Sequence, residues 1–351
     1  MLKILKQQSK HEKIKLIKQV EKIESIESVP NHPSKIKLEA DIYSGACISC
    51  TFPTCIKYHS NEVKNSLTDM FSSDLSEYVC AVDAIKWPSN LDTPLIDENS
   101  CINCGVCALR CPIGAIYLTE THAVVNDNSE IEYEIVEINE NSSIKFEEQL
   151  QKLSRVPRKG TLILESSHVL ETQISKIVEI SRNSNFVNLL VRNMMISLGV
   201  DVSISRQGDV YNRIDGVTRF DAGFGIVEIE IGKDALSLPR AILDDIAGLV
   251  SMHQFNLLEL HPLVIMLSLP NERSEYWRVI KDIKKVIGLE INTITLHVLF
   301  LLVWNLYDNV SFLKKFSFDN LFQSNRVILE NEIGRKLNIP IGLYGVIEAE
   351  K

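Results

Sequence analysis

The eight cysteines of this chain constrain its fold more than any other feature, because all of them lie between Cys47 and Cys111 of 351 residues. A disulfide framework spreads its cysteines over a small secreted fold. Confinement to one segment is instead typical of a site that binds a metal or a cluster, and thiols of that kind persist in a reducing compartment. We therefore expect a cofactor-binding segment in a cytoplasmic protein.

The densest part of this segment is a C-x2-C-x2-C-x3-C-P run. Its residues are Cys101, Cys104, Cys107, Cys111 and Pro112. Two-residue spacers let the backbone curl, so that three thiolates meet three corners of one iron–sulfur cube while the fourth reaches a neighbouring cube. Gly105 permits the curl, and Pro112 turns the chain away after it. The run predicts [4Fe-4S] chemistry.

A zinc site is the alternative interpretation, because paired C-x2-C units also form four-coordinate tetrahedral centres. A third cysteine two residues after the second, and a Cys-Pro pair that closes the run, are more than one tetrahedral ion requires. The spacing therefore favours a cluster over zinc.

Residues 40–118 resemble a bacterial-type two-cluster ferredoxin domain. The continuation Cys111-Pro-Ile-Gly-Ala-Ile116 matches that family's C-P-x-x-A-I, and Cys80-Ala-Val-Asp-Ala-Ile85 is its stretched counterpart in the first half. The resemblance implies an α+β ferredoxin-like fold. It also implies two [4Fe-4S] clusters that pass single electrons between redox partners, although clusters that only brace the fold are an alternative.

In this family each half of the domain lends its fourth cysteine to the other half's cluster. The resemblance therefore implies that cluster one is held by Cys47, Cys50, Cys55 and Cys111, and cluster two by Cys101, Cys104, Cys107 and Cys80. The chain departs from the family in three places. Four residues rather than two separate Cys50 from Cys55, 24 residues (56–79) precede Cys80, and Ala81 replaces a proline. If Cys55 is out of reach, the first site would hold a three-iron cluster or none.

We divide the chain into four parts. Residues 1–39 form a linker and an amphipathic helix expected over 8–28, where apolar residues recur at helical spacing and lysines occupy the other face. Residues 40–125 are the ferredoxin-like domain, with the insertion 56–79 expected to cover its first cluster. Residues 126–160 are an acidic linker, expected as an exposed hairpin, and 161–351 are a second domain.

The second domain alternates helical and strand patterns, which favours an α/β fold with a central mixed sheet. A helical pattern ends at Gly199 and is followed by a strand over 200–205. A hairpin follows, with strands at 210–217 and 225–231, and then a helix over 238–253. Alternation along the second hairpin strand places Glu228 and Glu230 on one face.

This order of elements resembles the restriction-endonuclease-like PD-(D/E)xK nuclease superfamily. The resemblance implies that Asp215 and Glu228 hold Mg²⁺ or Mn²⁺, with Glu230 at the position of the family's catalytic lysine. A carboxylate there can add a metal ligand but cannot offset the charge of an attacking hydroxide. The alternative is that both glutamates face solvent and that Asp215 belongs only to a turn.

Two functional readings follow. In the first, the iron–sulfur domain is fused to a nuclease-like domain that binds or cleaves DNA, although a net charge of −9 argues against a protein that coats nucleic acid generally. In the second, the protein is an electron-transfer subunit whose C-terminal domain docks a redox partner. We expect no signal peptide and no membrane association, since the apolar window 291–304 is shorter than the ~20 residues of a spanning helix. The sequence leaves the oligomeric state open.

Overall fold

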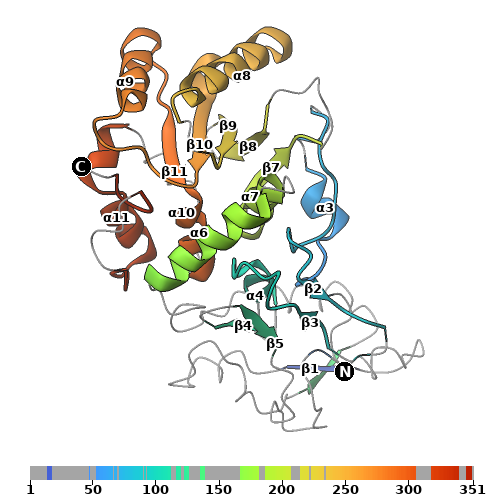
Figure 1. Ribbon diagram of the computed structural model, residues 1–351. Helices are drawn as coiled ribbons and strands as arrows, with labels where there is room; N and C mark the ends of the chain where they lie inside the picture. The colour runs from blue at the N-terminus through green and yellow to red at the C-terminus, as the bar shows by residue number, and fades with distance from the viewer. Residues whose placement is uncertain are drawn as a thin grey trace. The chain divides into compact units, whose positions relative to one another are not determined.

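The computed structural model describes about two thirds of the chain. The described residues are 14–17, 47, 53–65, 67–68, 71–89, 91, 93–111, 116–119, 122–125, 135–138, 167–181, 186–206, 214–220, 223–232, 235–305, 318–339 and 345–349. By their contacts they form two compact units, which we treat separately (Figure 1). The cysteine unit comprises 1–58, 78–164 and 304–306, and the sheet unit comprises 59–77, 165–303 and 307–351.

The cysteine unit is built from short antiparallel strand pairs around one small helix. The pairs are β2 (Ile85–Lys86) with β3 (Leu95–Ile96), and β4 (Ile116–Leu118) with β5 (Ala123–Val125), and the helix is α4 (Val106–Arg110). The β4–β5 turn is closed by Thr119, whose amide donates to the carbonyl of His122 at 2.9 Å. Ile116, Leu118 and Ala123 are buried, so this hairpin forms part of the unit's core.

A third pair corrects the expected N-terminal helix. Residues 14–17 of the predicted helix 8–28 form strand β1 (Ile14–Ile17), antiparallel to β6 (Ile135–Ile138), which falls inside the predicted acidic linker. Lys15 lies opposite Glu137, and the remaining partners are aliphatic. Backbone pairing with a strand about 120 positions away forms a strand here, in place of the helix that the spacing predicted. The predicted strands at 35–42 and 161–165 lie outside the described residues.

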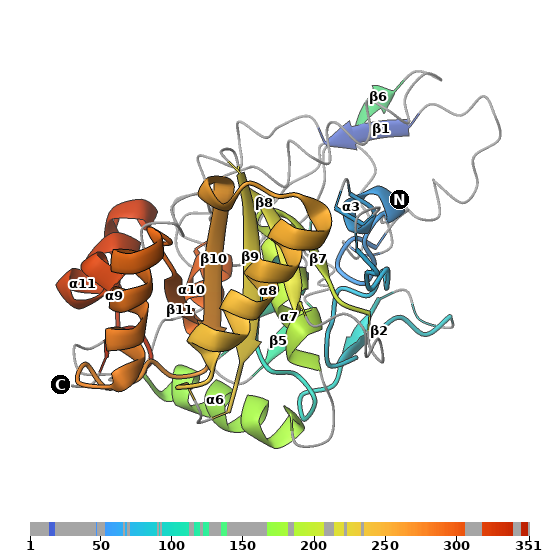
Figure 2. The same ribbon diagram turned by 90° about the horizontal axis from the view of Figure 1, so that it is seen from above.

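The sheet unit contains a five-stranded mixed sheet in the order β11-β10-β9-β8-β7 (Figures 1 and 2). The strands are β7 (Asp201–Ile204), β8 (Gly216–Phe220), β9 (Gly223–Glu230), β10 (Leu260–Met266) and β11 (Asn292–Thr295). β7, β8 and β9 are antiparallel neighbours, whereas β9, β10 and β11 run parallel. The predicted mixed sheet is therefore present.

Helices cover both faces of this sheet. Their bounds are α3 (Ser60–Val63), α6 (Ser167–Ser181), α7 (Phe186–Ser197), α8 (Leu238–His253), the 3-10 helix η2 (Leu257–Glu259), α9 (Glu275–Ile287), α10 (Leu296–Trp304) and α11 (Phe318–Ile333). α8 and α9 lie on one face, with α7 on the other (Figure 2). Ile242 and Ile280 are buried between the first pair of helices and the sheet, in one apolar core.

Helix ends follow local rules. α8 begins after Ser237 with Pro239 in its first turn, and α9 begins at Ser274, whose hydroxyl accepts from the amide of Tyr276. α9 ends at Gly288, which has a left-handed φ of 77°. The apolar window 291–304 comprises β11 and α10, and α10 is buried throughout. No helix in the described ranges is long and apolar enough to cross a membrane.

Most of the insertion differs from its expected placement. Residues 59–77 belong to the sheet unit, where Ser73 bridges Ser205 and the Asp74 amide donates to the Ile204 carbonyl at 3.0 Å. Leu67 is fully buried in the core of that unit. The insertion therefore continues the sheet beyond β7, because its backbone groups pair there and its apolar side chain finds a core.

Candidate iron–sulfur site and carboxylate cluster

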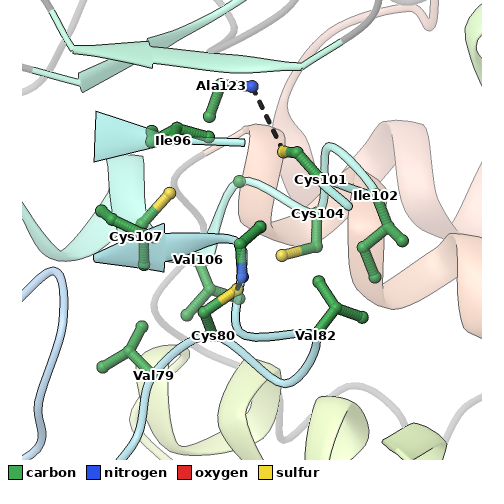
Figure 3. A pocket seen from close by; sticks show the side chains of 13 residues that line it. Val79, Cys80, Val82, Ile96, Cys101, Ile102, Cys104, Val106, Cys107 and Ala123 are labelled. Atoms are coloured by element: carbon green, nitrogen blue, oxygen red, sulfur yellow. Dashed lines mark hydrogen bonds between the residues drawn. The ribbon is translucent and has the colours of Figure 1, made fainter. Parts of the chain in front are cut away.

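Four of the predicted ligands line one pocket of the cysteine unit. They are Cys80, Cys101, Cys104 and Cys107, which we call the cysteine pocket (Figure 3). The rest of the lining is mostly apolar and includes Val79, Ile96 and Val106. This is the set that the ferredoxin resemblance implied for cluster two, with Cys80 contributed by the first half of the motif.

Local backbone conformations place these thiols. Asn103 and Gly105 have left-handed φ values of 57° and 84°, so the chain curls tightly on either side of Cys104. Gly105 is also the N-cap of α4, and this helix carries Cys107 and ends at Cys111. Glycine has no Cβ to oppose a positive φ, which explains its place in the run.

Backbone amides point at the sulfurs. The amide of Ala84 donates to Cys80 Sγ at 3.2 Å, while the amides of Asn103 and Ala123 each donate to Cys101 Sγ at 3.4 Å. Donors of this kind stabilise thiolate charge and the charge on a bound cluster. The pocket therefore supplies both the thiol ligands and the backbone amides that hydrogen-bond to their sulfurs.

The pocket also makes bare thiolates unfavourable. Burial raises the pKa of Cys104 and Cys107, and the negative charge of neighbouring thiolates raises the pKa of both further. Burial likewise raises the pKa of Cys80, against the lowering effect of backbone hydrogen bonds. A cationic iron centre would offset this accumulation of negative charge, so the donor set fits a cluster.

A cluster and a zinc ion require different arrangements of their ligands. Within the described ranges, no three His, Cys, Asp or Glu side chains converge as a single metal ion requires. A tetrahedral zinc ion needs its sulfurs about 2.3 Å away, around one point. In a cube each thiolate binds a different iron, so the ligands surround a pocket without meeting.

The other predicted set is described in part. Cys47, Cys55 and Cys111 are buried, and Cys50 lies outside the described residues. Thr54 Oγ1 donates to the carbonyl of Arg110 at 2.7 Å, and Arg110 Nε donates to the carbonyl of Thr54 at 2.9 Å. Because these two residues immediately precede Cys55 and Cys111, their reciprocal bonds bring the two cysteines side by side. The guanidinium of Arg110 also stacks 4.0 Å from the ring centroid of Tyr58.

The predicted carboxylates lie together in the sheet unit. Asp215 immediately precedes β8, and its carboxylate accepts from the Ile229 amide at 2.9 Å and from Asn188 Nδ2 on α7 at 3.2 Å. Glu228 lies on β9, half-buried. Burial, followed by the charges of Asp215 and Asp245 and a hydrogen bond with Asp245, raises the pKa of Glu228 to about 8.

Sequence reasoning missed two residues that interact with these carboxylates. Asp245 is 5% exposed on α8, and Asn188 binds Asp215 from α7. An acidic residue among the apolar positions of α8 was the signal for Asp245. Glu230 instead accepts from the amide of Gly232 in its own turn. We call Asp215, Glu228, Glu230 and Asp245 the carboxylate cluster, and no three of their side chains converge as ligands of one ion.

Comparison with known proteins bears on the cysteine unit. Residues 94–117 match the family model described as a 4Fe-4S binding domain. This chain carries an iron–sulfur, ferredoxin-type domain. A 40-residue segment is also 48% identical to an uncharacterized ferredoxin of Methanocaldococcus jannaschii, covering 11% of this chain and 25% of that protein. The match thus spans a quarter of the relative. No solved structure matches the chain.

Proposed function

We propose that this chain binds two [4Fe-4S] clusters and passes single electrons between redox partner proteins in the cytoplasm. The observation that carries this proposal is Cys80, from the first half of the motif, lining one pocket with Cys101, Cys104 and Cys107. Exchange of a fourth ligand is the arrangement of two-cluster domains. Its counterpart is Cys111 beside Cys55, held by the Thr54–Arg110 bonds.

The chain's own residues prepare the cysteine pocket. Amides of Ala84, Asn103 and Ala123 donate to sulfurs, and apolar side chains such as Val79 and Ile96 exclude water from the pocket. When bound, a [4Fe-4S] cluster supplies reversible one-electron transfer.

The test is reconstitution without oxygen, followed by iron and sulfide analysis and electron paramagnetic resonance of the reduced protein. We expect iron for two clusters. Cys104→Ala should remove half of it through the cysteine pocket, and Cys55→Ala should remove the other half. Unchanged iron in Cys55→Ala would reduce the proposal to one cluster, and unchanged iron in Cys104→Ala would refute the ligand assignment.

A second candidate function concerns the sheet unit. We propose that this unit is nuclease-like and binds DNA with Mg²⁺ or Mn²⁺ held by Asp215 and Glu228. The order α7-β7-β8-β9-α8-β10, antiparallel up to β9 and parallel after it, supports this proposal. So do the exposed side chains of Arg206, Arg219 and Arg240, which make no ion pair with any described residue and can contact phosphates.

Glu230 stands where the resembling nucleases have a catalytic lysine, so it determines how much cleavage we expect. Since it occupies the position of an ammonium group and binds its own turn, cleavage should be slow or absent while DNA binding is retained. The native protein and the Asp215→Ala/Glu228→Ala double variant should be incubated with supercoiled, linear and single-stranded DNA in either metal. Cleavage by the native protein alone would establish a nuclease. Neither cleavage nor binding would favour a C-terminal domain that only docks a redox partner.

A further inference from the structure

Trp304 contacts the cluster-binding loop from a distant part of the sequence. It is the last residue of α10, is fully buried, and belongs by its contacts to the cysteine unit. Its indole Nε1 donates to the main-chain carbonyl of Asn103 at 3.3 Å, across 201 sequence positions. Asn103 lies between Cys101 and Cys104, within the turn that forms the cysteine pocket.

Asn103 is held on three sides. Its backbone is left-handed, with φ 57°, and the residue is 2% exposed. Its Nδ2 donates to the carbonyl of Thr119 at 2.8 Å, and its amide donates to Cys101 Sγ at 3.4 Å. With the bond from Trp304 added, the side chain, amide and carbonyl of Asn103 are all engaged.

The carbonyl bond determines the direction of the next amide. A trans peptide is planar, so the carbonyl of Asn103 and the N–H of Cys104 point in opposite directions. Because Trp304 holds the carbonyl on one side, the Cys104 amide is directed to the other. The amide of Asn103, in the same turn, donates to Cys101 Sγ at 3.4 Å, so this turn directs backbone N–H groups toward the sulfurs.

We propose that Trp304 is a positioning residue that sets the reduction potential of the cluster held by Cys80, Cys101, Cys104 and Cys107, by fixing the orientation of the peptide between Asn103 and Cys104. The inference rests on the proposed cluster binding. Hydrogen bonds to the sulfurs stabilise the more negative reduced cluster and raise its potential. Loss of the indole donor frees the peptide to rotate and lowers the potential.

The experiment compares Trp304→Phe with Trp277→Phe in the reconstituted full chain. Trp277 is also buried and donates Nε1 to the carbonyl of Asn271 at 3.0 Å, but it lies in the sheet unit, so it is the matched control. The readout is a potentiometric titration followed by electron paramagnetic resonance. Trp304→Phe should shift one cluster to a more negative midpoint, so that its reduced fraction at the native midpoint falls several-fold. A tenfold change in the ratio of reduced to oxidised cluster corresponds to about 59 mV for one electron.

The outcomes separate the two claims. A native cluster signal whose potential is the same in Trp304→Phe and Trp277→Phe would overturn the inference alone, and so would equal shifts of both clusters. The absence of any cluster signal in the native protein would overturn the proposed function and the inference together.

A second pair of variants covers the case in which Trp304→Phe fails to fold. Asn103→Ala and Asn103→Gly both lose the Nδ2 bond to Thr119, but only alanine opposes a left-handed backbone. Asn103→Ala should therefore shift the potential of the same cluster in the negative direction, with Asn103→Gly closer to the native value. Identical potentials in the two variants would show that peptide orientation does not set the potential.

Discussion

The cysteine pocket and the carboxylate cluster both gather acidic groups away from bulk water, and they relieve the resulting charge differently. In the pocket, burial raises the pKa of three thiols, while backbone amides point at the sulfurs. In the cluster, Glu228 takes up a proton and hydrogen-bonds with Asp245, while Asp215 accepts from Asn188 and the Ile229 amide.

The cysteine pocket and the carboxylate cluster therefore depend differently on a bound cation. The carboxylate cluster reaches a partly neutral state with groups of its own chain. The cysteine pocket surrounds its thiols mainly with apolar side chains, so it needs a cationic group to become a favourable structure. We therefore expect the cofactor to be part of the fold of the cysteine unit, and any metal in the sheet unit to be an exchangeable ligand.

Removal of iron should produce the largest effect. An anaerobic chelator should expose the backbone amides of the cysteine unit to hydrogen exchange, because four thiols and short strands give it little stability without the cluster. The sheet unit has its own apolar core and should keep its protection, including Leu67 in the insertion. Equal loss of protection in both units would contradict this separation.

Replacement of Arg192 should be the next largest effect, confined to the sheet unit. Arg192 is 1% exposed on α7 and donates to the carbonyl of Asp74 at 2.9 Å, to the Asp74 carboxylate at 3.2 Å and to the Ser76 carbonyl at 2.7 Å. Arg192→Met leaves these half-buried acceptors without their buried, charged donor, which should cost about 3 kcal/mol.

Urea unfolding followed by far-ultraviolet circular dichroism, which reports the helices of the sheet unit, measures this cost. Arg206→Met is the control, since Arg206 has an exposed side chain beside the same loop and its amide, which bonds to the Ser72 carbonyl, is unchanged. A loss of stability no larger than in the control would mean that the insertion does not depend on Arg192.

The two regions also differ in how far sequence reasoning could reach. Ligand spacing is local, so the cysteine run and its glycine predicted iron–sulfur chemistry, which the family match confirms at residues 94–117. Helix α8 has its predicted bounds, 238–253, because its proline and apolar spacing are local signals. The helix that Gly199 was expected to close is present as α7, which begins at Phe186, and α6 is a separate helix before it.

Contacts between distant segments carried no such signal. β1 pairs with β6 about 120 positions away, residues 59–77 join a sheet whose first strand begins at Asp201, and Trp304 binds Asn103. Asp245 and Asn188 reach the carboxylates from separate helices. In each case a contact with a distant residue determines the local structure, and the spacing of neighbouring residues carries no information about that contact.

His297 should make the sheet unit sensitive to acid. It is fully buried on α10, neither ring nitrogen has a hydrogen-bond partner among the described residues, and burial lowers its pKa to about 4 from 6.5. The unfolded chain therefore takes up a proton below about pH 6.5 and the folded chain only below about 4. Stability should fall across that window by about 3 kcal/mol.

His297→Met tests this prediction, because methionine fills a similar volume without a titrating group. The difference in unfolding free energy between native protein and variant, measured at pH 7 and at pH 4, isolates the histidine from other acid titrations. As pH falls, the free energy of unfolding of the variant should rise relative to that of the native protein. A constant difference would show that the pKa of His297 is the same in the folded and the unfolded chain.

Titration of Glu228 should have the smallest effect on stability. Unlike His297, it should destabilise the fold as pH rises. Its pKa in the folded protein is about 8 against an ordinary 4.5, so its stabilising contribution is complete below pH 4.5 and is lost as pH rises through 8. Glu228→Gln keeps a neutral side chain at every pH. Because Glu228 is only half-buried, solvent screening limits the expected gain at pH 8 to the order of 2 kcal/mol.

The control for this variant is Glu230→Gln, on the same face of β9, whose carboxylate bonds the Gly232 amide rather than Asp245. Thermal unfolding between pH 6 and 9 should show a smaller pH dependence in Glu228→Gln than in Glu230→Gln. Added Mg²⁺ sharpens the result: if Glu228 is a metal ligand, the cation should stabilise the native protein increasingly as pH rises, since binding displaces the proton. Equal stabilisation of Glu228→Gln by Mg²⁺ would remove Glu228 from the proposed metal site and leave it a buried acid of the fold.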